Sequence, residues 1–230
     1  MSRFNNKCYR NVQNPKKMAI FIHGYNGRPE AIDYAVQDLA AKLNDDTVVV
    51  VPQAPEICEK DAANLQWLSF YEVDPKAEFR NPAVSTEDIV EIFNKLSHSF
   101  SRVAKEINLF VDEMQAQFGI ADENTYLVGF SQGAMLSLYA SLIRPKEIGG
   151  CVMNAGIVAG KDLLEKEMKS KPRLILLHGQ DDVTVQYKTL PYTLDWLIRH
   201  GLKPGCKTYP NLAHRMCSQQ MQDAADFINS

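Results

Sequence analysis

The sequence has no long apolar stretch. No apolar run approaches the ~20 residues that a helix needs to cross a bilayer. Residues 1–17, MSRFNNKCYRNVQNPKK, are polar and lack the apolar segment of a secretory signal peptide. The sequence therefore predicts no integral membrane association, and we expect a cytoplasmic protein.

Paired cysteines, basic clusters and metal-binding histidine motifs are also missing. The five cysteines form an odd set without CxxC spacing, which argues against a disulfide framework or a zinc knuckle and favours a reducing compartment. The net charge is -3 and no basic block occurs, so nucleic acid is not an expected partner. No HExxH motif occurs and the histidines lack metal spacing, so we expect no metal.

The overall composition is that of an ordinary globular protein. The chain has 230 residues, of which 45% are hydrophobic and 23% charged. A chain of this length can bury roughly 70% of its unfolded surface, so its core needs no disulfide or metal to be stable. We expect residues 1–230 to form a single domain.

Short apolar runs alternate with longer amphipathic patterns. Several runs are apolar at nearly every position, which indicates strands buried on both faces. The expected strands are 18–23, 47–52, 125–130, 149–156, 173–179 and 206–210. Helical patterns lie at 29–43, 101–119, 190–201 and 218–229. This alternation predicts an α/β fold with a mostly parallel central sheet and helices on both faces.

One region, residues 53–97, is irregular and too long for a bare connection. Such an insertion is typically a functional lid, or it contains short helices. Trp67, Phe70 and Tyr71 within it have two readings. Either they line a ligand-binding groove, or they form a satellite core beneath a long loop.

A serine stands between two glycines where a predicted strand meets a predicted helix. The pattern is Gly129-Phe130-Ser131-Gln132-Gly133, a G-x-S-x-G motif. A nucleophile elbow requires this strand-to-helix context, and glycines allow close approach of neighbouring backbone. A helix starting after Ser131 directs N–H groups and its positive dipole end toward that point. The alternative is a structural turn serine.

A nucleophilic serine needs a base and an orienting acid. These are expected later in the chain, in the order acid then histidine. His214 follows the last predicted strand and precedes the last helix, so it is the candidate base. Asp182, in an H-G-x-x-D-x-x-V arrangement, is the candidate acid and is preferred to its neighbour Asp181.

An oxyanion hole uses the amide of the residue after the nucleophile and one from a loop after an early strand. Here these are the backbone N–H groups of Gln132 and Tyr25. His23 and His178 each precede a glycine at a strand end, and we expect them to shape turns.

These motifs together resemble a known family. The sequence resembles the α/β-hydrolase superfamily and, within it, the phospholipase/carboxylesterase family that includes the acyl-protein thioesterases. The motifs that carry the resemblance, in the family's order, are H-G-Y from residue 23, VPQAP, QWLSFYEVDP, GFSQGA, HGQDD and LAHRM. The resemblance implies Ser131 as nucleophile, His214 as base, Asp182 as acid, Tyr25 and Gln132 as oxyanion donors, and no metal or organic cofactor.

The implied activity is hydrolysis of carboxylic esters or thioesters through an acyl-enzyme. The implied substrates are a small ester, an acyl thioester or a lysophospholipid. Two alternatives remain: a binding protein that keeps the fold without turnover, and transfer of the acyl group to a thiol or alcohol other than water. The sequence carries no signal for acyl-chain length or oligomeric state.

Overall fold

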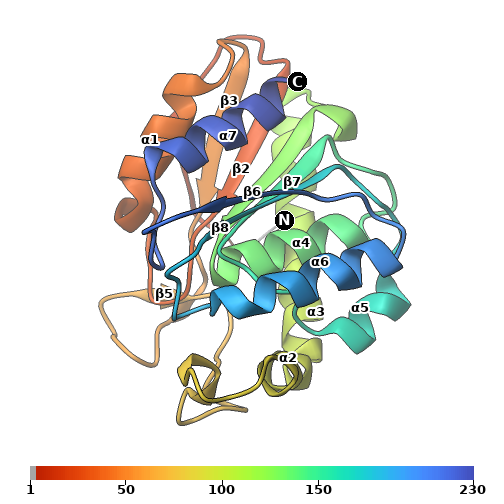
Figure 1. The fold of residues 1–230 in the computed structure, drawn as a ribbon. Coiled ribbons are helices and arrows are strands. Elements are labelled where there is room, and N and C mark those ends of the chain that lie inside the picture. The colour runs from red at the N-terminus through yellow and green to blue at the C-terminus, as the bar shows by residue number, and fades with distance from the viewer. Residues whose placement is uncertain (1–3) are drawn as a thin grey trace.

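A seven-stranded sheet forms the centre of the computed structural model, which describes residues 4–230. Its strand order is β1-β3-β2-β6-β7-β8-β9 (Figure 1). Every neighbouring pair is parallel except β1 and β3. The strands are β1 (Asn6–Arg10), β2 (Lys17–Ile22), β3 (Thr47–Pro52), β6 (Thr125–Phe130), β7 (Gly150–Asn154), β8 (Leu174–Gly179) and β9 (Gly205–Tyr209). The predicted, mostly parallel sheet is confirmed.

The inner strands are buried on both faces, as their apolar runs predict. All residues of β3, β7 and β8 are buried. Successive side chains of a strand point to opposite faces. Met18, Ile20 and Ile22 of β2 therefore join one core, while Ala19 and Phe21 join the core on the other face.

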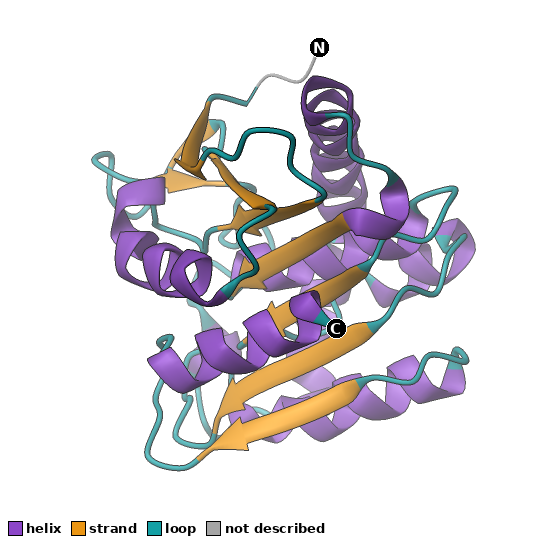
Figure 2. Ribbon diagram, turned by 90° about the horizontal axis from the view of Figure 1, so that it is seen from above, coloured by secondary structure: helices purple, strands orange, loops and turns teal. Residues whose placement is uncertain are grey.

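Helices cover both faces of the sheet (Figures 1 and 2). One face carries α1 (Asp33–Lys42) and α7 (Ser218–Asn229), whose apolar residues share a core. The opposite face carries α2 (Thr86–Lys95), α3 (Ser97–Phe118), α4 (Gln132–Ile143), α5 (Lys161–Glu167) and α6 (Leu190–Arg199). Every residue of α4 is buried, so this helix lies in the middle of the molecule. No helix of residues 4–230 is long and apolar enough to cross a bilayer.

Outside residues 53–97, one strand and one helix of the described chain were not expected from the sequence. The edge strand β1 is largely exposed, and it pairs through its backbone with β3. A polar edge strand has no apolar periodicity, which explains why the pattern misses it. The short α5 buries only Leu164, too little for a recognisable amphipathic stripe.

Element boundaries also differ from the prediction. The helix predicted from Pro29 begins as a 3-10 turn, η1 (Pro29–Ile32), and continues as α1. Helix α3 begins at Ser97 rather than at Ser101. Three further 3-10 turns are η2 (Glu78–Arg80), η3 (Asp122–Asn124) and η4 (Tyr187–Thr189).

The irregular region 53–97 contains short elements. They are a hairpin of β4 (Glu56–Ile57) and β5 (Leu65–Gln66), the turn η2 and helix α2. Trp67 is fully buried, and its Nε1–H donates to the carbonyl of His23 at 2.8 Å. The insertion is thus anchored, through buried contacts, to the residue that follows the carboxyl end of β2. That it moves as a lid stays a prediction.

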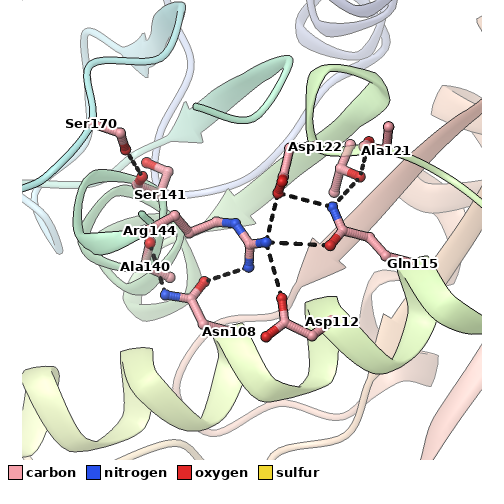
Figure 3. A network of polar contacts seen from close by, with 10 residues as sticks. Asn108, Asp112, Gln115, Ala121, Asp122, Ala140, Ser141, Arg144 and Ser170 are labelled. Atoms are coloured by element: carbon pink, nitrogen blue, oxygen red, sulfur yellow. Dashed lines mark hydrogen bonds and ion pairs between the residues drawn. The ribbon is translucent and has the colours of Figure 1, made fainter. Parts of the chain in front are cut away.

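A buried arginine ties the end of α4 to its neighbours (Figure 3). The Arg144 guanidinium donates to Asp122 at 2.6 Å, Asp112 at 3.0 Å, Gln115 at 3.2 Å and Asn108 at 3.4 Å. Three of these partners lie on α3, and Asp122 begins η3, just before β6. The network therefore holds the carboxyl end of α4 against α3 and against the entry to β6.

Candidate active site

The strand-to-helix turn at Ser131 is tight and strained. Ser131 has φ 55° and ψ -120°, a positive φ that L residues rarely adopt. A Cβ added to Gly129 would lie 2.3 Å from the carbonyl oxygen of Gly133, and one added to Gly133 would lie 2.0 Å from that of Ile22. Any side chain at either position would collide with backbone, which explains both glycines of the motif.

Three predicted residues meet at the carboxyl edge of the sheet. Ser131 follows β6, Asp182 follows β8, and His214 follows β9. The Ser131 hydroxyl lies 3.0 Å from His214 Nε2, and His214 Nδ1 lies 2.7 Å from Asp182 Oδ2. Because a carboxylate only accepts, Nδ1 carries the hydrogen and Nε2 is free to accept from the serine hydroxyl. Asp181 is exposed and does not contact the imidazole.

The Asp182 carboxylate is held in its charged form. Its Oδ1 accepts from the amides of Thr184 at 2.9 Å and Val185 at 3.0 Å. Burial opposes the charge, but hydrogen bonds from His178 and His214 outweigh it and lower the pKa of Asp182 to about 2. An ionised carboxylate therefore faces the imidazole across the whole neutral range.

His178 contributes more than the predicted turn. Its Nε2 lies 2.9 Å from the carbonyl oxygen of Val185 and 3.4 Å from Asp182 Oδ2. The ring is buried at the end of β8, where it supports the loop that presents the acid. The sequence places His178 and Asp182 four residues apart, but this spacing alone does not reveal the contact.

Two backbone amides near Ser131 are unused. Neither the amide of Tyr25 nor that of Gln132 has an acceptor among residues 4–230. Gln132 opens α4, where first-turn amides lack intrahelical partners. A Cβ added to Gly24 would lie 3.3 Å from Ser131 Cβ, so the loop that carries Tyr25 passes beside the serine. Both predicted oxyanion donors thus belong to segments adjoining Ser131.

The Gln132 side chain has a role that the sequence did not reveal. It is fully buried, its Oε1 accepts from the Trp67 amide, and its Nε2 donates to the Leu68 carbonyl, both at 3.0 Å. These bonds fix the insertion to the serine turn. No local pattern signals the pair, because the partners lie 65 and 64 residues apart.

Replacing Gln132 by methionine is expected to lower the free energy of unfolding by about 1–3 kcal/mol, because two buried backbone groups lose their partners. Urea denaturation measures the change. The control is Gln219→Met on α7, where the glutamine is exposed and the effect should stay within about 0.5 kcal/mol. Equal free energies of unfolding for the two variants would show that the two hydrogen bonds of the Gln132 side chain do not stabilise the fold.

His23 organises the turn before Tyr25 as a neutral ring. Its Nδ1–H donates to the Gly24 carbonyl at 2.9 Å, and its Nε2 accepts from the Ala54 amide at 3.1 Å. Burial lowers the pKa of His23 to about 4. Protonation of Nε2 would remove the acceptor for Ala54, so the turn depends on the uncharged imidazole.

This arrangement predicts acid-sensitive stability. Below pH ~6.5 the unfolded chain protonates His23, but the folded chain does so only near pH 4. The unfolded state then binds more protons, so the free energy of unfolding falls as pH falls through this window, by up to about 3 kcal/mol. In denaturant titrations from pH 7 to pH 4, the free energy of unfolding of His23→Gln should fall less with pH than that of the wild type. The exposed His98→Gln should keep the wild-type slope.

A cavity of about 260 Å³ opens beside Ser131 and His214. Phe70, Phe79 and Phe93 line it and pack against one another with ring centroids 5.4–5.5 Å apart. Its remaining lining residues are Tyr25, Asn26, Lys60, Arg80, Phe130, Met135, Thr184 and Val185. Of the three aromatic residues singled out in the insertion, Phe70 lines the cavity and Trp67 belongs to the core. Tyr71 does not line it.

The described part of the chain, residues 4–230, contains no group of three or more histidine, cysteine, aspartate or glutamate side chains placed to hold a metal ion.

Comparisons with known proteins found a matching family model and similar proteins. A family model described as phospholipase/carboxylesterase matches residues 7–230. The chain is 25% identical over 232 residues to acyl-protein thioesterase 1 from Candida albicans, covering 96% of this chain and 94% of that protein. It is 31% identical over 127 residues to probable carboxylesterase SOBER1-like from Arabidopsis thaliana, a match that spans 54% of this chain and only 48% of the relative.

A solved structure shares the fold. The crystal structure of esterase PE8 matches with a TM-score of 0.82 at 23% identity, covering 98% of this chain and 97% of that one. The α/β-hydrolase architecture expected from the sequence is confirmed by this likeness and by the family match.

Proposed function

Because the chain belongs to the phospholipase/carboxylesterase family, we propose that it cleaves carboxylic esters or thioesters through an acyl-enzyme on Ser131. The observation that carries this proposal is the continuous hydrogen-bonded chain from Ser131 through His214 to Asp182. The family and the thioesterase and carboxylesterase relatives make the protein a hydrolase.

The reaction begins with proton transfer. His214 Nε2 takes the Ser131 proton as Oγ attacks the substrate carbonyl, and the amides of Tyr25 and Gln132 stabilise the resulting oxyanion. His214 then returns the proton to the departing alcohol or thiol, which leaves an ester on Ser131. Water repeats the sequence, with His214 as base and then as acid, and releases the carboxylic acid.

Asp182 serves this cycle without itself taking up a proton. Its carboxylate accepts from His214 Nδ1–H, which fixes the tautomer and stabilises the imidazolium formed in each half-reaction. Its low pKa, about 2, keeps the proton on the imidazole rather than on the acid. Phe130 packs beside the imidazole, with ring centroids 4.8 Å apart, and limits its rotation.

The proposal is tested by covalent labelling. A fluorophosphonate probe should modify Ser131, and mass spectrometry of the digested protein should place the adduct on the peptide that contains it. A protein that ignores the probe and hydrolyses no activated ester would instead support the alternative, a binding protein that keeps the fold without turnover.

The cavity supports a preference for short acyl chains. Its volume of about 260 Å³ lies below the ~300–1,000 Å³ of typical ligand pockets. In a p-nitrophenyl ester series, we expect kcat/KM for the butyrate to exceed that for the dodecanoate by roughly tenfold or more. Phe93→Leu should move the optimum to longer chains. A palmitoylated peptide thioester cleaved faster than every short ester would contradict this expectation.

We further propose that the protein acts as a single cytoplasmic domain without a cofactor. Its substrates are then a small ester, an acyl thioester or a lysophospholipid, and not a nucleic acid. The names of the relatives, a thioesterase and a carboxylesterase, support the ester and thioester classes alike.

A further inference from the structure

We propose that the natural substrate carries a carboxylate a short chain length from the scissile carbonyl, and that Lys60 and Arg80 bind this group. The inference rests on the proposed ester hydrolysis at Ser131 and specifies the substrate class for that site.

The charge of the cavity carries the inference. Lys60 and Arg80 line the same cavity as Ser131 and His214, and no aspartate or glutamate lines it. Within residues 4–230, neither cation forms an ion pair, and neither side chain donates a hydrogen bond. Two positive charges that share one cavity without a carboxylate on its wall create a field that attracts an anion.

Arg80 shows the more specific feature. Its Nε is buried and lacks a hydrogen-bond partner among the described residues, while its guanidinium lies 5.1 Å from the centre of the Phe79 ring. A buried donor without a partner is costly and calls for an explanation. The two terminal nitrogens, Nη1 and Nη2, also lack partners but are not buried. They can bind a carboxylate from the cavity through two parallel hydrogen bonds.

The backbone around Arg80 is held in place from both sides. Gln186 Nε2 donates to the carbonyl oxygens of Phe79 at 2.8 Å and Asn81 at 3.0 Å. The Asp74 carboxylate accepts from the amides of Glu78 at 2.9 Å and Phe79 at 3.0 Å. The backbone that carries Arg80 is thus fixed and needs little ordering when an anion binds.

The nearest carboxylates in the sequence have other partners. Asp61, next to Lys60, accepts from the Ala63 amide at 3.0 Å and from Asn64 Nδ2 at 2.9 Å. Glu59, next to Lys60, accepts from the Tyr25 hydroxyl at 3.1 Å. Glu78, two residues before Arg80, accepts from the Asn81 amide group at 3.1 Å. None of these three carboxylates lines the cavity, so the positive charge of Lys60 and Arg80 is left to face the substrate.

The test compares esters that differ by one charge. On the acyl side, 4-nitrophenyl hydrogen adipate is paired with 4-nitrophenyl methyl adipate. On the alcohol side, 4-carboxyphenyl butyrate is paired with its methyl ester. For each pair the readout is the ratio of kcat/KM, charged over neutral, after subtraction of spontaneous hydrolysis. The pair that responds shows on which side of the ester the carboxylate lies.

In at least one pair, the double variant Lys60→Gln/Arg80→Gln should lower the ratio by roughly tenfold or more. The ratios for the single variants Lys60→Gln and Arg80→Gln should lie between those of the double variant and the wild type. Lys203→Gln, an exposed lysine just before β9, should leave the ratio unchanged. If Arg80→Gln fails to fold, the exposed Lys60→Gln alone still reports the effect.

An unchanged ratio in both pairs would overturn the assignment of Lys60 and Arg80 and leave ester hydrolysis itself intact. Failure of the proposed function has a separate signature, since the wild type would then hydrolyse none of the four esters.

Discussion

Ser131→Ala is expected to lower kcat for an activated ester by roughly 10⁴- to 10⁶-fold, because the acyl-enzyme can no longer form. Hydrolysis of p-nitrophenyl butyrate measures the loss, and labelling by a fluorophosphonate should vanish with it. Weak residual catalysis would come from the oxyanion donors and from substrate binding.

The matched control lies in the same helix. Ser137 is buried in α4, and its hydroxyl has no hydrogen-bond partner among the described residues. Ser137→Ala should therefore fold and keep activity within about twofold of wild type. Activity that survives Ser131→Ala, or that is lost equally in both variants, would exclude Ser131 as the nucleophile.

Asp182→Asn should lower kcat by roughly 10⁴-fold while the site geometry persists. An asparagine amide can donate to His214 Nδ1, which would place the ring hydrogen on Nε2. That nitrogen could then no longer accept the Ser131 proton, so the serine would stay inactive. Steady-state kinetics on p-nitrophenyl butyrate measure the effect, and near-ultraviolet circular dichroism checks that the fold is unchanged.

Asp181→Asn is the control for the neighbouring carboxylate. Its side chain is exposed and makes no hydrogen bond or ion pair within residues 4–230, while its backbone amide donates to the Leu212 carbonyl at 3.0 Å. We expect activity within about twofold of wild type, as for most exposed substitutions. If Asp181→Asn proved the more damaging change, the assignment of the acid would have to be reversed.

The sequence predicts the inner sheet well, because strands buried on both faces need nearly continuous apolar runs. The runs from Met18, Thr47 and Thr125 became β2, β3 and β6 with ends shifted by at most one residue. Edge strand β1 escaped the prediction, since its stability comes from backbone pairing with β3 rather than from its own side chains.

The candidate site divides in the same way. Ser131, Asp182 and His214 were identified because motif order and strand ends place them at one edge of a parallel sheet. The bond between Gln132 and Trp67, the contact of His178 with the acid, and the cations of the cavity were not identified. Each depends on tertiary contacts between distant segments, which produce no motif or periodic pattern in the sequence.

The full burial of α4 links the reactive turn to the stability of the whole molecule. Arg144 holds one end of this helix, and Ser131 stands at the other. A helix without an exposed face has no surface at which to fray, so we expect its hydrogen-bonded amides to exchange with solvent only on global unfolding. On heating, we therefore expect the geometry of the Ser131 turn to be lost together with the global fold and not before it.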